Sequence, residues 1–134
     1  MTAAEDIERI RRGYAAWNTG DVEAALAFIR EDVEIRPVLG DVVSADVFRG
    51  HDGFRHWYRT VHASFEDFRA EIEDVRDAGD GRYLILLRFQ GTGRASGADV
   101  ALVGAHVMTL VNGVVIAIDG YQDRAEALGA VGLA

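Results

Sequence analysis

The pattern of hydrophobic and polar residues predicts helices in the first half of the chain and strands in the second. In residues 3–18, apolar side chains recur at the spacing of one helix face, and charged residues fill the other faces. These apolar residues are Ile7, Ile10, Tyr14 and Trp17. Gly20 suits the end of this helix and Asp21 can cap the next one, so the pattern predicts a second helix over residues 22–30. Two short helices joined so tightly must pack against another layer.

A short strand and a third helix are expected next. Residues 33–36 alternate between apolar and polar side chains, as a strand does, and Pro37 ends its pairing or places it at a sheet edge. Residues 37–50 are predicted to form a loop. In residues 52–64, bulky side chains recur at helical spacing, which predicts a helix with one apolar face. These side chains are Phe54, Trp57, Tyr58 and Val61.

The rest of the chain is expected to form successive strands followed by a short helix. The strands are predicted over residues 65–77, 82–94, 99–111 and 114–118, with turn signals at Asp80-Gly81, 95–98 and Asn112-Gly113. The helix is predicted over residues 123–131, capped by Asp123. This order predicts an α+β fold in which the helices pack on one face of a strongly curved antiparallel sheet. A length of 134 residues fits one domain, residues 1–134.

Composition and charge narrow the classes of function. The chain has no cysteine, which excludes disulfides and thiolate chemistry, and its formal net charge of −8 argues against nucleic acid and anionic membranes as partners. No apolar run approaches the roughly 20 residues that span a bilayer, and the N-terminus lacks the layout of a signal peptide. We therefore expect a cytoplasmic protein. Asp52 and His56 are helical neighbours, but two residues do not make a metal site, so neither a metal nor a cofactor is expected.

One ionisable residue, His106, lies in the middle of an apolar strand, and its surroundings depend on the turn at Asn112-Gly113. A two-residue turn places His106 directly opposite Asp119, where the two side chains could share a hydrogen bond. A three-residue turn with Gly113 as a bulge places His106 on the same side as Gly120 and points Asp119 the other way. A histidine in a dry cavity is a candidate acid or base. The alternative is a histidine with a purely structural role in the core or on the outer sheet face.

Several sequence segments, taken together and in order, resemble one known superfamily. They are residues 14–21 (Tyr-Ala-Ala-Trp-Asn-Thr-Gly-Asp), residues 49–54 (Arg-Gly-His-Asp-Gly-Phe), Ser96-Gly97, and Asn112-Gly113 followed by residues 121–128. The set is similar to the nuclear-transport-factor-2-like superfamily, in particular its SnoaL-like branch. The resemblance implies that the sheet curls around the helices into a cone with an apolar internal cavity. It also implies a homodimer that forms through the outer face of the sheet.

Within this resemblance, His106 matches the position of a histidine in SnoaL-like polyketide cyclases, whose aspartate base corresponds to Gly120. Both of those family residues reach the cavity, so the resemblance favours the three-residue turn and an outward-facing Asp119. The tyrosine and aspartate of the superfamily's ketosteroid isomerases correspond to Gly13 and Pro37. The isomerase residues are therefore missing from this sequence.

The aromatic residues of the predicted helices and strands are candidates to line such a cavity. As a group they could hold a flat apolar molecule, with Tyr58 as a hydrogen-bonding group, although each residue taken alone is equally consistent with an ordinary core. The candidates are Trp17, Phe54, Trp57, Tyr58, Phe89 and Met108, with Tyr14 and Gln122 as polar groups at the mouth.

The resemblance and the residues leave two functions open. The first is binding of a small apolar, polyketide- or steroid-like molecule with cofactor-independent isomerase, cyclase or hydrolase chemistry, for which His106 and Asp119 are the candidate catalytic residues. The second is a non-catalytic ligand-binding or accessory protein of the same fold. A carboxylate and Tyr58 beside His106 in one cavity favour the enzyme, whereas His106 alone among apolar groups favours binding.

Overall fold

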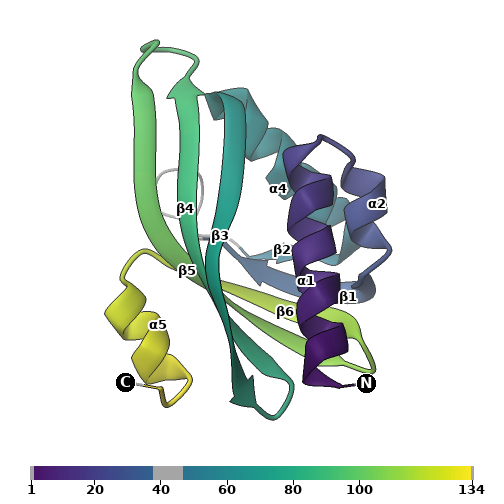
Figure 1. The fold of residues 1–134 in the computed structure, drawn as a ribbon. Coiled ribbons are helices and arrows are strands. Elements are labelled where there is room, and N and C mark those ends of the chain that lie inside the picture. Colours follow the sequence, from purple (N-terminus) through teal and green to yellow (C-terminus); the bar gives the residue numbers. More distant parts are fainter. Residues whose placement is uncertain (1, 38–46, 134) are drawn as a thin grey trace.

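The computed structural model describes residues 2–37 and 47–133 and shows helices packed against one curved sheet (Figure 1). In chain order the elements are α1 (Ala3–Asn18), α2 (Val22–Leu26), β1 (Ile29–Arg36), β2 (Phe48–Arg49), α4 (Gly50–Ser64), β3 (Phe65–Gly79), β4 (Arg82–Gly93), β5 (Asp99–Val111), β6 (Val114–Tyr121) and α5 (Arg124–Ala130). The sheet order is β2-β1-β6-β5-β4-β3. Neighbouring strands are antiparallel except β1 and β6, which run parallel. The predicted α+β fold with a curved sheet is confirmed.

The helices divide between the two faces of the sheet. Helices α1, α2 and α4 lie on one side of the long strands, and α5 lies on the other side near the C-terminus (Figure 1). The larger core lies between the first three helices and the sheet, and its most deeply buried sheet residues include Ile35, Ile85 and Leu87. A smaller apolar cluster, which includes Leu84 and Val107, lies under α5.

Local sequence explains where the helices begin. Thr2 caps α1 and forms a reciprocal capping box with Glu5, which satisfies two backbone donors at the helix start. The side chains of Asp21 and Asp123 cap α2 and α5, as the sequence predicts. The predicted apolar stripes are also found. Their buried members are Ile10, Tyr14 and Trp17 on α1, and Phe54, Trp57 and Val61 on α4.

The prediction of a helix over residues 22–30 is wrong at its C-terminal end. Helix α2 stops at Leu26, and the chain enters β1 at Ile29, before the predicted strand start. The cause is tertiary, because Ile29 pairs with Val115 on β6 and the Val115 N–H donates to the Phe28 carbonyl at 2.8 Å. Strand pairing therefore overrides the helical spacing of this segment.

Two further boundaries differ from the predicted ones. Helix α4 begins at Gly50, two residues before the predicted start. The predicted loop over residues 37–50 contains the short strand β2, which pairs with β1, and residues 38–46 of that loop lie outside the described residues.

The β5–β6 hairpin combines features of both turns that the sequence leaves open. Asn112 and Gly113 have φ angles of +51° and +79°, which makes this a two-residue turn, and the favoured three-residue turn is wrong. The register then shifts between Thr109 and Leu110, because β6 has one extra residue there. This bulge places His106 opposite Gly120. His106 therefore lies on the expected face of the sheet, but the bulge in β6 places it there, and the type of turn does not.

Candidate functional site

A pocket of about 80 Å³ lies on the inner side of the sheet, between the strands and helices α1 and α4. Seven of the ten predicted site residues line this pocket. They are Tyr14, Trp17, Phe54, Trp57, Phe89, His106 and Met108. The wall is otherwise apolar apart from Arg9, and it contains no carboxylate among the described residues. The pocket is therefore an aromatic chamber with very few polar groups.

His106 is the most unusual residue in this chamber. It lies on β5, opposite Ile85 on β4 and Gly120 on β6, and its side chain is only 3% exposed. Its Nδ1 atom shares a hydrogen bond with the hydroxyl of Tyr14 from α1. Its Nε2 atom forms no hydrogen bond with a described residue. The indole N–H of Trp17, which also lines the pocket, is buried without a hydrogen-bond partner among the same residues.

Aromatic rings surround the imidazole of His106. The ring centroids of Tyr14, Phe89 and Trp57 lie 5.9, 5.8 and 6.0 Å from its centroid. The helical spacing of α1 and α4 and the alternation of β4 and β5 bring these residues to one place. The result is an imidazole that is isolated from water and from charged groups.

Burial fixes the protonation of this pair. Loss of water lowers the pKa of His106 to about 4 and raises the pKa of Tyr14 well above its usual value of 10.0. At neutral pH both side chains are therefore uncharged. Together they can form hydrogen bonds to a neutral group, but they offer no charge to a bound molecule.

Three predicted site residues lie outside the pocket wall. Asp119 lies opposite Val107 on the outer face and forms an ion pair with Arg36 at 3.2 Å. The His106–Asp119 pairing that a two-residue turn alone predicts is therefore not formed, because the bulge in β6 moves Asp119 to the other face. Tyr58 is half-buried and stacks on His62, with ring centroids 3.9 Å apart. Gln122 is exposed.

Sequence analysis missed other residues in and near the site. Arg9 and Gly13 of α1 both line the pocket, and Arg9 also donates to the Gly113 carbonyl at 3.4 Å. Their spacing of four residues places them on one helix face, which is a signal that could have identified them. Near the start of α1, Asp6 is buried and accepts a hydrogen bond from the Tyr83 hydroxyl at 2.8 Å.

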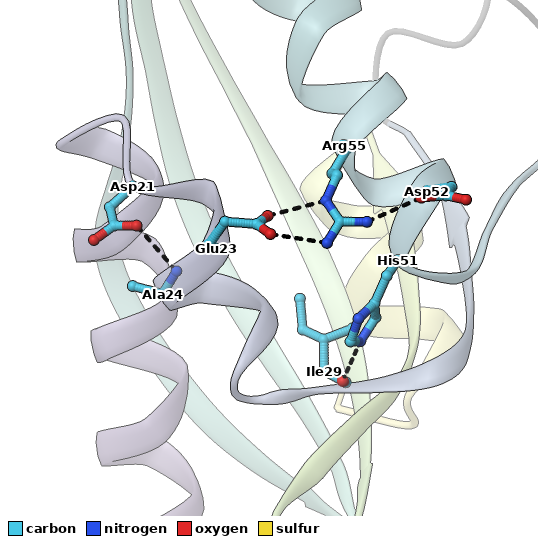
Figure 2. A network of polar contacts seen from close by, with 7 residues as sticks. All are labelled: Asp21, Glu23, Ala24, Ile29, His51, Asp52 and Arg55. Atoms are coloured by element: carbon cyan, nitrogen blue, oxygen red, sulfur yellow. Dashed lines mark hydrogen bonds and ion pairs between the residues drawn. The ribbon is translucent and has the colours of Figure 1, made fainter.

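A polar network joins α2, β1 and α4 beside the pocket (Figure 2). The guanidinium of Arg55 donates to both oxygens of Glu23, at 3.0 and 2.8 Å, and to Asp52 at 2.9 Å. The Nε2 atom of His51 donates a hydrogen bond to the backbone carbonyl of Ile29 at 2.7 Å. Because Ile29 lines the pocket, this network holds one part of its wall against α4.

The described residues contain no group of three or more histidine, aspartate or glutamate side chains placed to hold a metal ion. Within the same residues, no helix is long and apolar enough to cross a bilayer.

Comparison with known protein families identifies one whose model matches most of the chain. The SnoaL-like domain family model matches residues 10–118, which is most of the chain. No curated protein matches the sequence.

Many solved structures share the fold at low sequence identity. An NTF2-like protein of unknown function from Burkholderia pseudomallei has a TM-score of 0.79 and 22% identity, with 98% of each chain covered. TerC, co-crystallized with polyporic acid, has a TM-score of 0.79 and 21% identity over 96% of this chain and 98% of that one. A candidate polyketide cyclase from Xanthomonas campestris has a TM-score of 0.73 and 21% identity over 96% and 97%. At these identities the likeness supports the fold alone.

Proposed function

This chain belongs to the SnoaL-like domain family, and on that premise we propose that its pocket binds a small apolar molecule without chemical turnover. One observation carries the proposal. The pocket wall is aromatic and aliphatic around an uncharged Tyr14–His106 pair, and no carboxylate lines it among the described residues. An apolar chamber with a few convergent polar groups is the usual form of a small-molecule site.

The lowered pKa of His106 and the lack of a carboxylate argue against a general base in the ligand-free protein. Acid–base catalysis is most efficient when the pKa of the catalytic group lies near the working pH, whereas burial lowers the pKa of His106 to about 4. The position that carries the aspartate base in the cyclases is Gly120 here, and Asp119 pairs with Arg36 on the other face. A carboxylate partner for His106 is thus missing from the described pocket wall.

A second candidate function is cofactor-independent isomerase, cyclase or hydrolase chemistry on a polyketide- or steroid-like molecule. The hydrogen bond between Tyr14 and His106 in a dry chamber favours it, because a hydroxyl and an imidazole in contact can pass a proton. TerC, a structural neighbour, was crystallized with polyporic acid, which encourages trials with ligands of that kind. A bound molecule that is recovered chemically changed would favour this candidate over simple binding.

Intrinsic fluorescence provides a test of binding, because both tryptophans of the chain, Trp17 and Trp57, line the pocket. Titration with toluene is expected to change this fluorescence in a saturable way. The variant Gly13→Leu, which adds a side chain to the pocket wall, is expected to weaken the response strongly. The matched control is Gly129→Leu, a glycine on α5 outside the pocket, which should respond as the wild type does. An equal, non-saturating response from all three proteins would contradict the proposal.

We also propose that the chain forms a homodimer through the outer face of the sheet and acts in the cytoplasm. The dimer proposal is supported by apolar side chains on β5 that lie exposed in the single chain, such as Val103, which is 51% exposed. The cytoplasmic location rests on the sequence alone.

A further inference from the structure

The hydrogen-bonding groups of the Tyr14–His106 pair can be assigned by counting. An uncharged imidazole has one N–H and one nitrogen that accepts, and the hydroxyl of tyrosine has one hydrogen to donate. Both side chains are at least nine-tenths buried, and the bond to Nδ1 is the sole hydrogen bond that the Tyr14 hydroxyl forms among the described residues. Two arrangements of the hydrogens are therefore possible.

In the first arrangement, the Tyr14 hydroxyl donates to Nδ1, and the imidazole hydrogen is on Nε2. The Nε2–H, on a residue that lines the pocket, is then left without a hydrogen-bond partner among the described residues. In the second, Nδ1–H donates to the Tyr14 oxygen, which leaves both the tyrosine hydrogen and the Nε2 lone pair without partners. Buried unpaired polar groups are costly, so the first arrangement is favoured. Tyr14 thus sets the tautomer of His106.

We propose that the Nε2–H of His106 is a fixed hydrogen-bond donor for the bound molecule, and that the pocket selects compact, uncharged carbonyl compounds. This inference deepens the proposed binding function and rests on it. A carbonyl oxygen accepts the unpaired hydrogen, while the carbon skeleton contacts Trp57, Phe89 and the other rings.

The charged group of the wall, the guanidinium of Arg9, lies far from this donor. Arg9 bonds to the carbonyl of Gly113 in the β5–β6 turn. His106 lies several residues back along β5, which places it roughly 20 Å from that turn at the rise of a β-strand. The charge of Arg9 therefore does not serve a group bound at His106. The aromatic surroundings of Nε2 favour an uncharged acceptor over a carboxylate, which would lose its hydration without gaining a cation.

The small volume of the pocket, about 80 Å³, restricts the size of the molecule. It is smaller than the cavity of about 150 Å³ that holds benzene in a well-known engineered case. A single ring with one carbonyl is thus the upper size limit of the proposed class, and side chains of the wall must shift slightly to admit it. Cyclohexanone is a suitable probe, and methylenecyclohexane has the same shape without the acceptor oxygen.

Nitrogen-15 NMR of the ligand-free protein tests the tautomer directly. The signals of His106 are assigned by comparison with His106→Leu, since the chain has four histidines. We expect a protonated Nε2 and an unprotonated, hydrogen-bonded Nδ1 in the wild type. In Tyr14→Phe the preference for this tautomer should weaken. A proton on Nδ1 in the wild type overturns the inference.

Binding of the two probes tests the selectivity. The ratio of the affinities for cyclohexanone and methylenecyclohexane should be about tenfold higher in the wild type than in His106→Leu, because only the ketone uses the donor. Use of a ratio cancels the different hydration of the two probes. If His106→Leu does not fold, the comparison is made with Tyr14→Phe, for which a smaller loss of the ratio is expected.

The control is His56→Gln, which changes an exposed histidine outside the pocket and should keep the wild-type ratio. Equal ratios in the wild type and His106→Leu, with both probes bound, overturn the carbonyl selectivity but leave the binding function intact. Failure of both probes to bind the wild type contradicts the binding function itself. The two failures are therefore distinguishable.

Discussion

At the residue scale, His106 makes the stability of the protein depend on pH. Its pKa is about 4 in the folded protein and near 6.5 in the unfolded chain, so between these values the unfolded chain binds a proton that the folded protein does not. The stability that the neutral, buried His106 contributes is fully present above pH 6.5. It is lost as the pH falls towards 4.

This linkage predicts a measurable difference between the wild type and His106→Leu. Between pH 7 and pH 4, the free energy of unfolding of the wild type should fall by about 3 kcal/mol more than that of the variant. Urea unfolding at the two pH values provides the measurement. Parallel losses in both proteins would show that His106 titrates normally in the folded state.

Asp6 and Tyr83 form a second buried polar pair, which joins α1 to the sheet. Tyr83→Phe removes the donor and leaves the Asp6 carboxyl without this partner, so we expect a loss of about 2 kcal/mol in the free energy of unfolding. The matched control is Tyr121→Phe. The Tyr121 hydroxyl has no hydrogen bond among the described residues, so its removal should cost little. Chemical unfolding of the two variants tests the difference.

The residues of the pocket were predictable to different extents. Helical spacing identifies Tyr14, Trp17 and Trp57, because a helix presents such residues on one face whatever they contact. The spacing does not distinguish Tyr58 from the residues that line the pocket. Tyr58 lies beside Trp57 in sequence but stacks on His62 outside the pocket wall. The Tyr14–His106 hydrogen bond joins residues 92 positions apart, and no local pattern reports such a contact.

At the element scale, Gly13 is a glycine in the interior of α1 that no close packing requires. A Cβ atom built there meets nothing within 4 Å. Gly13→Ala is therefore expected to raise the free energy of unfolding by about 1 kcal/mol, through the better helix propensity of alanine. Thermal or urea unfolding measures this change, and a loss of stability would show that the glycine has a backbone role.

The link between α2 and α4 is expected to contribute little to stability despite its good geometry. Glu23 is mostly exposed, and exposed ion pairs are weakened by water and salt. Arg55→Met should therefore lower the thermal midpoint only slightly, and the difference from the wild type should disappear in 1 M sodium chloride. A large difference that persists in salt would indicate that the network of Figure 2 is energetically essential.

The errors of element prediction have a common cause. Helix α2 ends early because Ile29 pairs with β6, which is distant in sequence, and β6, which carries the bulge, pairs with β1 as well as with β5. Turn chemistry is local, so Asn112-Gly113 was located correctly. The bulge after the turn depends on how β6 fits between β5 and β1, and single-sequence patterns do not encode that fit.

At the scale of the whole molecule, the proposed dimer can be tested on the outer face of the sheet. Val103 is exposed on β5 opposite Arg88, so a second copy packed there would bury it. Val103→Glu should then favour the monomer, because it would place a charge in an apolar interface. Light scattering after size exclusion measures the mass of both proteins. A monomeric wild type at micromolar concentration contradicts the proposal.

The pairing of His106 with Gly120 has an evolutionary consequence. Directly opposed residues in an antiparallel pair have Cβ atoms about 5 Å apart, so an aspartate at position 120 would begin within reach of the imidazole. In the genetic code, the glycine codons GGU and GGC differ from the aspartate codons GAU and GAC only in the middle base. A single base change in such a codon would thus place a carboxylate opposite the imidazole of His106.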